Sequence, residues 1–171
     1  MRWTVPVVSA RFDGRDTTTA GAWPLKYGSL AAWLPKVTPV SPQKGYSLEL
    51  RHGQPFLWAP TSNDPRVPEA PAGPRRSTCW FADQTVSLAV TPPDTRPYRL
   101  ALYLLDWDRN KRAMEVALTG ELGALDAQQA TIEETDRGVY LRWTVTGPIT
   151  IEVRKTAGYN AVISGVFVDP A

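Results

Sequence analysis

Apolar and polar positions alternate with a period of two along much of the chain, a pattern typical of β-strands that have one buried face. The alternation occupies residues 45–50, 86–90, 139–145 and 149–153. In the first of these stretches, Tyr46, Leu48 and Leu50 are separated by polar residues. The pattern therefore predicts several short strands rather than helices.

Residues 98–107 differ from these stretches because they are almost continuously apolar. Such a run is typical of a central strand that is covered on both faces, so we expect it to lie in the core. Asp108 and Asn110 follow in a segment typical of a turn, and residues 113–119 alternate again. The pattern predicts a β-hairpin formed by these two strands.

The last part of the chain predicts a second hairpin and a final strand. Gly147 and Pro148 separate two alternating stretches, and this pair of residues favours a turn. After a further turn, residues 161–169 read as the last strand. Gly165 lies inside it, where we expect a β-bulge or a close approach of the backbone.

Helical periodicity is almost absent from the sequence. The best helical candidate is residues 29–34, and Pro35 ends it after less than two turns. Residues 58–74 are too rich in proline for a central strand, so we expect a long surface loop, a feature that is often functional. Together the patterns predict an all-β fold, a jelly-roll β-sandwich.

Composition supports one jelly-roll domain over residues 1–171. A chain of this length buries a sizeable core without disulfides, and its 16 prolines and 12 glycines are spread over the whole sequence, as many turns require. No stretch is long and apolar enough for a transmembrane helix, and the first residues lack the apolar stretch of a signal peptide. The sequence predicts no membrane partner and leaves the compartment open.

Charge argues against a nucleic-acid partner. The 19 basic and 17 acidic residues leave a net charge of +2, and the arginines are scattered along the sequence. Nucleic-acid binding needs a basic face that neutralises several phosphates, and the sequence predicts none.

Several segments of the chain resemble a bacterial galactose-binding-like jelly-roll domain that is attached to glycoside hydrolases and other large extracellular proteins. The matching segments are residues 98–108, 138–143 and 158–169, and upstream of them Trp58-Ala59, Asp64-Pro65-Arg66 and Cys79-Trp80-Phe81. The resemblance spans residues 56–169. The first fifty residues depart from the pattern, because the sequence after Tyr27-Gly28 continues as Ser29-Leu-Ala-Ala-Trp33.

The resemblance implies a galactose-binding-like fold and a non-catalytic role as a carbohydrate-binding or accessory module. The implied partners are a glycan or polysaccharide and other domains of a larger protein, and the implied location is extracellular. The alternative hypothesis is a protein-interaction or structural β-sandwich module, because the sequence alone locates no convergent polar site. A glycoside hydrolase is the third hypothesis.

The hydrolase hypothesis rests only on Asp106 and Asp108. Glycosidases hold their two carboxylates on either side of the scissile bond, whereas a turn at Asp108 and an ion pair between Asp106 and an arginine such as Arg112 explain these residues more simply. His52 is the only histidine, and no Gly-x-Ser-x-Gly motif accompanies it. We therefore expect no enzymatic activity.

Aromatic side chains are the most unusual feature, since the chain has seven tryptophans. An apolar ring matches the C–H face of a pyranose, so exposed aromatic rings suit sugar binding. Four tryptophans in or beside strands are expected in the core: Trp58, Trp80, Trp107 and Trp143. Three aromatic residues in turn-like contexts are the predicted stacking residues: Trp23, Trp33 and Tyr159.

The predicted loop 58–74 supplies the polar candidates. Asp64 and Arg66 offer an acceptor and a donor, which together satisfy a sugar hydroxyl, and this places the predicted ligand site at the loop end of the sandwich. The simpler alternative is that the two side chains bond each other and brace the loop. The predicted ligand-binding residues are therefore Trp23, Trp33, Asp64, Arg66 and Tyr159.

Two further features concern cofactors and reactivity. Cys79 is the only cysteine, and the large aromatic residues that follow it favour a buried thiol over a nucleophile. Galactose-binding-like folds often carry a structural calcium ion, and Asp13 and Asp16 are the oxygen ligands that the sequence offers. Their short segment is unlike an EF-hand loop, so the calcium hypothesis rests on the resemblance, and no other cofactor is expected.

Overall fold

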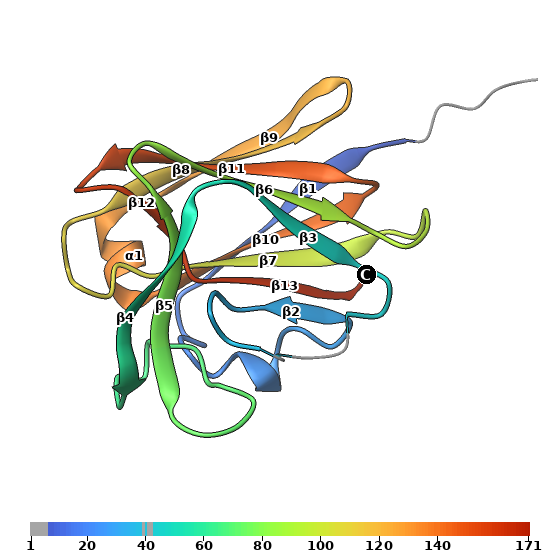
Figure 1. Ribbon diagram of the computed structural model, residues 1–171. Coiled ribbons are helices and arrows are strands. Elements are labelled where there is room, and N and C mark those ends of the chain that lie inside the picture. Colours follow the sequence, from blue (N-terminus) through green and yellow to red (C-terminus); the bar gives the residue numbers. More distant parts are fainter. Residues whose placement is uncertain (1–6, 39, 41–42) are drawn as a thin grey trace, which may run out of the picture.

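Two five-stranded antiparallel sheets form a β-sandwich in the computed structural model, which describes residues 7–38, 40 and 43–171 (Figure 1). The all-β prediction is confirmed. The expectation that the first residues lack the apolar stretch of a signal peptide concerns residues 1–6, which lie outside the described residues. No helix in the described part of the chain is long and apolar enough to cross a membrane.

The first sheet has the strand order β1-β10-β7-β13-β2. Its strands are β1 (Ser9–Asp16), β10 (Val139–Thr146), β7 (Tyr98–Leu104), β13 (Gly165–Pro170) and β2 (Ala31–Trp33). Strand β7 pairs with β10 on one side and β13 on the other. The continuously apolar stretch is therefore the central strand of this sheet, as its sequence predicts.

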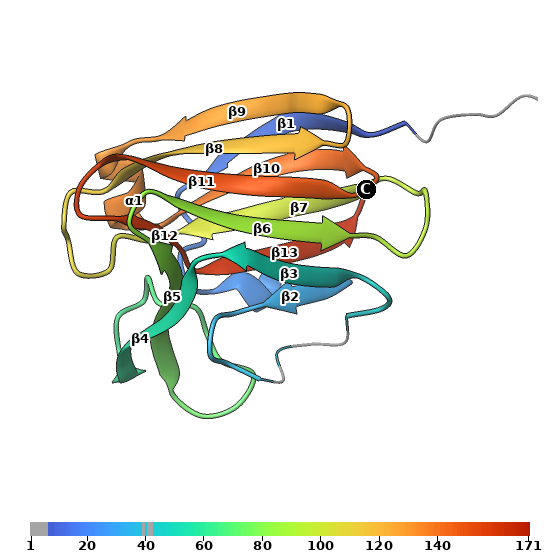
Figure 2. The same ribbon diagram turned by 45° about the horizontal axis from the view of Figure 1, so that its top comes forward.

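The second sheet has the order β3-β6-β11-β8-β9, and Figure 2 shows its strands side by side as one layer over the first sheet. Its strands are β3 (Ser47–His52), β6 (Thr85–Thr91), β11 (Ile149–Ala157), β8 (Ala113–Gly120) and β9 (Gly123–Ala130). A smaller sheet of order β12-β5-β4 extends from one end of the sandwich. Its strands are β12 (Ala161–Ile163), β5 (Arg75–Ala82) and β4 (Gln54–Ser62).

Both predicted hairpins are wrong in the same way. Strands β7 and β8 do not pair, because β7 belongs to the first sheet and β8 pairs with β11 and β9 in the second. Strands β10 and β11, on either side of Gly147, also lie in different sheets. Each turn carries the chain across the sandwich instead of back along the same sheet. This alternation between sheets is the connectivity of a jelly roll.

Two local predictions are also corrected. Residues 58–62 belong to β4 and not to a loop, because β4 is an edge strand, where proline loses no ladder hydrogen bond. Residues 29–34 form no helix; β2 lies there and pairs with β13. The helices within the described residues are a 3₁₀ turn, η1 (Trp23–Leu25), and α1 (Ile132–Arg137). Helix α1 begins at a capping box, in which Thr131 and Glu134 bond each other's backbone N–H.

The interior contains two apolar clusters on opposite faces of the first sheet. The main core lies between the large sheets and includes Leu102 and Trp143, both fully buried. The second cluster lies on the outer face, where residues from 17–37 and 63–74 cover one half of the first sheet; it includes Trp23, Tyr140 and Phe167. The other half of that outer face remains open and forms a pocket.

Candidate functional site

The five predicted ligand-binding residues lie in three different places. Trp23 is buried at 5% exposure, its ring packs on Phe167, and its indole N–H donates to the carbonyl of Glu69. Trp33 is partly buried on the edge strand β2, where it lines an apolar groove with Trp80. Trp23 therefore has the environment of a core residue, and among the described residues no hydrogen bond joins Trp23 or Trp33 to the side chains of Asp64 and Arg66.

Asp64 and Arg66 bond each other, as the simpler alternative for this pair predicts. The guanidinium nitrogens of Arg66 lie 2.7 to 3.2 Å from the Asp64 carboxylate. Burial disfavours the charged carboxylate, but the bonds from Arg66 outweigh it and lower the pKa of Asp64. Arg66 also donates to the carbonyls of Trp107 and Asp136, at 3.1 and 2.7 Å. The pair therefore fixes the segment that carries Trp107.

A second arginine organises the same end of the sandwich. The Arg112 guanidinium is buried and donates to the carboxylates of Asp106 and Asp108 and to the side-chain carbonyl of Asn160. The predicted pairing of Asp106 with Arg112 is confirmed. Both carboxylates that motivated the hydrolase hypothesis are thus occupied by one cation.

Four partly exposed aromatic rings adjoin one another beside Arg112, and we call them the aromatic row: Phe81, Phe56, Trp58 and Trp107. Successive ring centroids lie 5.7, 6.4 and 5.7 Å apart along this row. The Trp58 ring stacks on Trp107 and lies 5.7 Å from the Arg112 guanidinium. Phe56 is 44% exposed. The four rings come from β4, β5 and the segment after β7. The packing of these three segments against one another holds the rings together at the surface.

The prediction that four tryptophans lie in the core was wrong in part for Trp58 and Trp107. Trp80 and Trp143 are buried, as expected, but Trp58 and Trp107 keep part of their surface accessible. Strand β4 is an edge strand of the small sheet, and this explains why Trp58 escapes complete burial. Tyr159, at 72% exposure, lies in the turn whose Gly158 packs against the backbone of Arg112. Tyr159, Asp64 and Arg66 therefore do lie at one end of the molecule.

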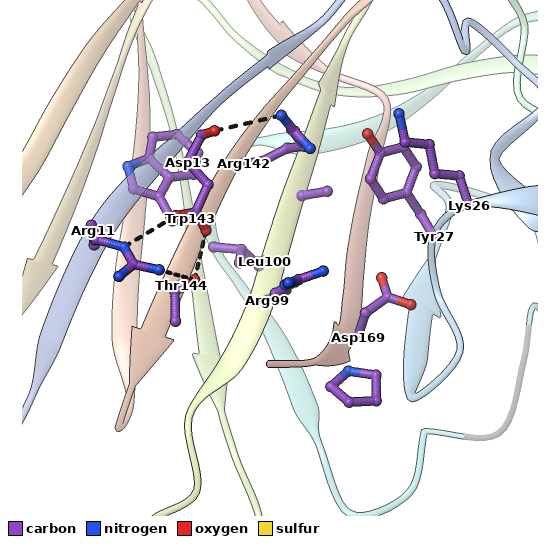
Figure 3. Close-up of a pocket in the computed structure, with 12 residues that line it drawn as sticks. Arg11, Asp13, Lys26, Tyr27, Arg99, Leu100, Arg142, Trp143, Thr144 and Asp169 are labelled. Atoms are coloured by element: carbon purple, nitrogen blue, oxygen red, sulfur yellow. Dashed lines mark hydrogen bonds and ion pairs between the residues drawn. The ribbon is translucent and has the colours of Figure 1, made fainter.

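The open half of the first sheet's outer face forms a polar pocket of about 500 Å³ (Figure 3). Its charged lining residues are Arg11, Asp13, Lys26, Arg99, Arg142 and Asp169. We call it the outer-face pocket. On one side Arg11 and Thr144 bond the Asp13 carboxylate at 3.2 and 2.6 Å. On the other side the ring of Tyr27 forms the wall.

Asp16 fixes the wall that carries Tyr27. Its carboxylate accepts hydrogen bonds from the amides and hydroxyls of Thr18 and Thr19, and the Tyr27 hydroxyl and Lys26 ammonium lie 2.6 and 3.1 Å from it. Burial alone would raise the pKa of Asp16, but these hydrogen bonds outweigh it and hold the pKa far below its usual range. The carboxylate therefore stays charged and anchors the wall.

Comparison with known proteins gives only distant structural likeness. No family model and no curated protein matches the chain. A solved carbohydrate-binding module, TmCBM61 in complex with β-1,4-galactotriose, shares 12% identity at a TM-score of 0.35, over 72% of this chain and 83% of that one. Carbohydrate-binding modules from the β-sandwich superfamily, described for promiscuous specificity, share 10% identity at a TM-score of 0.35, over 73% and 55%. Likenesses this weak carry no argument about the ligand.

The calcium hypothesis stays a prediction. The described residues contain no group of three or more His, Cys, Asp or Glu side chains placed to hold a metal ion. Asp13 is bonded by Arg11 and Thr144, whereas the Asp16 carboxylate is bonded by N–H and O–H donors and by Lys26. Cys79 is buried as expected, and burial raises the pKa of its thiol to about 12.

Proposed function

We propose that this domain is a non-catalytic glycan-binding module whose aromatic row stacks against sugar rings. The observation that carries the proposal is the row itself: four adjoining rings stay partly exposed, while Trp23, Trp80 and Trp143 are buried. Rings of this kind offer apolar faces to the C–H groups of a pyranose, and their few rotatable bonds keep the entropic cost of binding low.

Polar groups beside the row suit the hydroxyls of a sugar. The side chains of Asp108 and Asp136 are 36% and 45% exposed, and the Arg109 side chain is 69% exposed. Carboxylate acceptors and guanidinium donors next to an apolar ring are the combination found in ligand sites that orient a polar molecule. Arg66 and Arg112 lie behind the row and hold Trp107 and Trp58 in position.

The non-catalytic part of the proposal rests on the carboxylates. Asp106 is 1% exposed and bonded to Arg112, so it is unavailable as a general acid. Asp108 shares the same arginine. Two carboxylates held on one cation do not flank a bound sugar from both sides, which is the arrangement that glycoside hydrolysis requires.

The test is a screen for binding followed by variants of the row. The wild-type protein is run on native gels containing soluble polysaccharides, and Phe56→Ala and Trp107→Ala are compared with Leu122→Ala, which removes a side chain that is 91% exposed and lies outside the row. We expect each row variant to weaken binding about tenfold or more, equivalent to ~1.4 kcal/mol, and the Leu122 variant to bind normally. Melting temperatures establish that the variants are folded.

No retardation by any polysaccharide, with folded protein, would overturn the proposal and favour the protein-interaction alternative. Equal weakening by Leu122→Ala would also overturn it, because the effect would then not belong to the row. Release of reducing sugar from the bound polysaccharide would contradict the non-catalytic part.

A further inference from the structure

The outer-face pocket holds two arginines that lack an anionic partner. Among the described residues, the guanidinium of Arg99 makes no hydrogen bond and no ion pair. Arg142 has one long contact, from Nη2 to the carbonyl of Asp13 at 3.5 Å, and its buried Nε has no partner. By contrast, Arg11 is paired with Asp13 and Lys26 with Asp16.

The sheet register places the two arginines on one face. Arg99 lies opposite Thr144 and Arg142 opposite Ala101 on the paired strands β7 and β10. Arg99 and Arg142 are thus diagonal neighbours, with Cα atoms about 7 to 8 Å apart in a regular antiparallel pair. Figure 3 shows both side chains in the same pocket. Two like charges in one pocket repel each other, and an anion bound between them would relieve the repulsion.

A local bulge leaves room for the Arg142 guanidinium. Strand β1 shifts register between Phe12 and Gly14, and Gly14 has φ +120°, where a side chain is strained. A Cβ at Gly14 would lie 3.2 Å from Nη2 of Arg142. The glycine therefore leaves space for the Arg142 guanidinium beside β1, and the Nη1 group of Arg142 makes no hydrogen bond among the described residues.

Two carboxylates at the rim define the ligand further. Asp169 lies opposite Arg99 in the register, yet no ion pair within 4 Å joins them, because its oxygens accept from the amides of Gly28 and Ser29, both at 2.9 Å. Asp13 occupies the other rim. Inorganic phosphate or sulfate offers mainly acceptor oxygens and would face these carboxylates. A sugar acid offers a carboxylate to the arginines and hydroxyl donors to the aspartates.

We propose that the outer-face pocket binds a uronic acid residue, with Arg99 and Arg142 on its carboxylate and Asp13 and Asp169 accepting from its hydroxyls. The pocket shares no residue with the aromatic row, so this site stands independently of the function proposed for that surface. A linear polyuronate is the class of polymer that carries such a residue.

The experiment is calorimetric titration of the full chain with an α-1,4-linked galacturonate trimer and with the matching neutral galactose trimer. Variants Arg99→Gln and Arg142→Gln are compared with Arg154→Gln, which removes the same charge from an exposed residue on the other sheet. We expect the uronate to bind and the neutral trimer to bind at least tenfold more weakly. Both pocket variants should lose at least tenfold in uronate affinity, while Arg154→Gln should keep it.

Several outcomes would overturn the inference. Absence of uronate binding by the wild-type protein would do so, as would an equal loss in Arg154→Gln, which would show a general charge effect. If inorganic phosphate displaced the uronate and bound as tightly as the uronate does, at constant ionic strength, the two arginines would form a site for any small oxyanion rather than for a sugar acid. Loss of uronate affinity in Phe56→Ala, with Arg99→Gln and Arg142→Gln binding normally, would place the uronate on the aromatic row instead and would overturn the inference.

Discussion

Arg112 and Asp106 form a buried ion pair at the loop end of the sandwich: Nη1 lies 2.6 Å from Oδ1, and the two side chains are 3% and 1% exposed. The pair closes the crossover from β7 to β8, which contains Trp107. Arg112 also lies 5.7 Å from the Trp58 ring and donates to Asn160. One buried cation thus ties together the crossover, an aromatic ring and the turn before β12.

Asp106→Asn should destabilise the protein strongly. Removing one partner of a buried ion pair leaves an uncompensated charge, which typically costs about 3 to 5 kcal/mol; Asp108 remains as a partial partner, so we expect the lower end of that range. Urea unfolding at pH 7 measures it. The matched control is Asp94→Asn, which breaks an exposed pair with Arg96, and it should leave the unfolding midpoint nearly unchanged. Similar midpoints for the two variants would contradict the structural role of the buried pair.

Leu102→Ala should reduce the free energy of unfolding by about 2 to 5 kcal/mol, because it removes a fully buried side chain from the central strand of the first sheet. Leu122→Ala, at a position that is 91% exposed, serves as the control and should change the stability by less than about 0.5 kcal/mol. A loss below about 1 kcal/mol for Leu102→Ala would show that β7 is not central.

The local sequence patterns predicted the strands well but not how they pair. Alternation at β3, β6, β10 and β11 indicates which face of each strand is buried. That buried face is the same whether the next strand in the chain pairs in the same sheet or lies in the opposite sheet. The hairpin predictions failed because a turn such as Gly147-Pro148 permits both connections. The choice depends on long-range packing that no local pattern records.

Helix α1 shows a signal that could have been recognised. Thr131 and Glu134 have the spacing of a capping box, but the helical candidate taken from the sequence was residues 29–34. The aromatic row could be predicted only in part, since Trp58 and Trp107 are distant in sequence and meet only through the small sheet. The outer-face pocket gave no local signal, because Arg99 and Arg142 become neighbours only through the register of β7 and β10.

Stability should fall in acid partly through Asp16. Its pKa is lowered in the folded state, so its contribution is fully present above the unfolded-state pKa of about 3.9 and is lost as the pH falls toward the folded-state value. Asp16→Asn should therefore cost about 2 kcal/mol or more at pH 7, and the difference from wild type should shrink below about pH 4. Urea unfolding at pH 7, 4 and 2.5 measures this difference. A difference that is constant over this range would contradict the role given to the carboxylate.

Cys79 should be unreactive in the folded protein. Burial raises the pKa of its thiol to about 12, so little thiolate exists at pH 8, and the side chain is 1% exposed. A thiol-specific chromogenic reagent should react with one thiol per chain in denaturant and almost none without it. Rapid reaction of the folded protein would show that the small sheet opens readily.

The most direct measurement of the proposed function is an NMR titration that follows the indole N–H signals of the seven tryptophans. The titrant is the polysaccharide fragment that binds most tightly in the gel screen. If the aromatic row binds glycan, the signals of Trp58 and Trp107 should shift most, while Trp23 and Trp143, whose indole N–H groups bond Glu69 and Asp126 inside the protein, should stay in place. Shifts confined to Trp33, Trp80 or Trp143, with Trp58 and Trp107 unmoved, would contradict glycan binding at this surface.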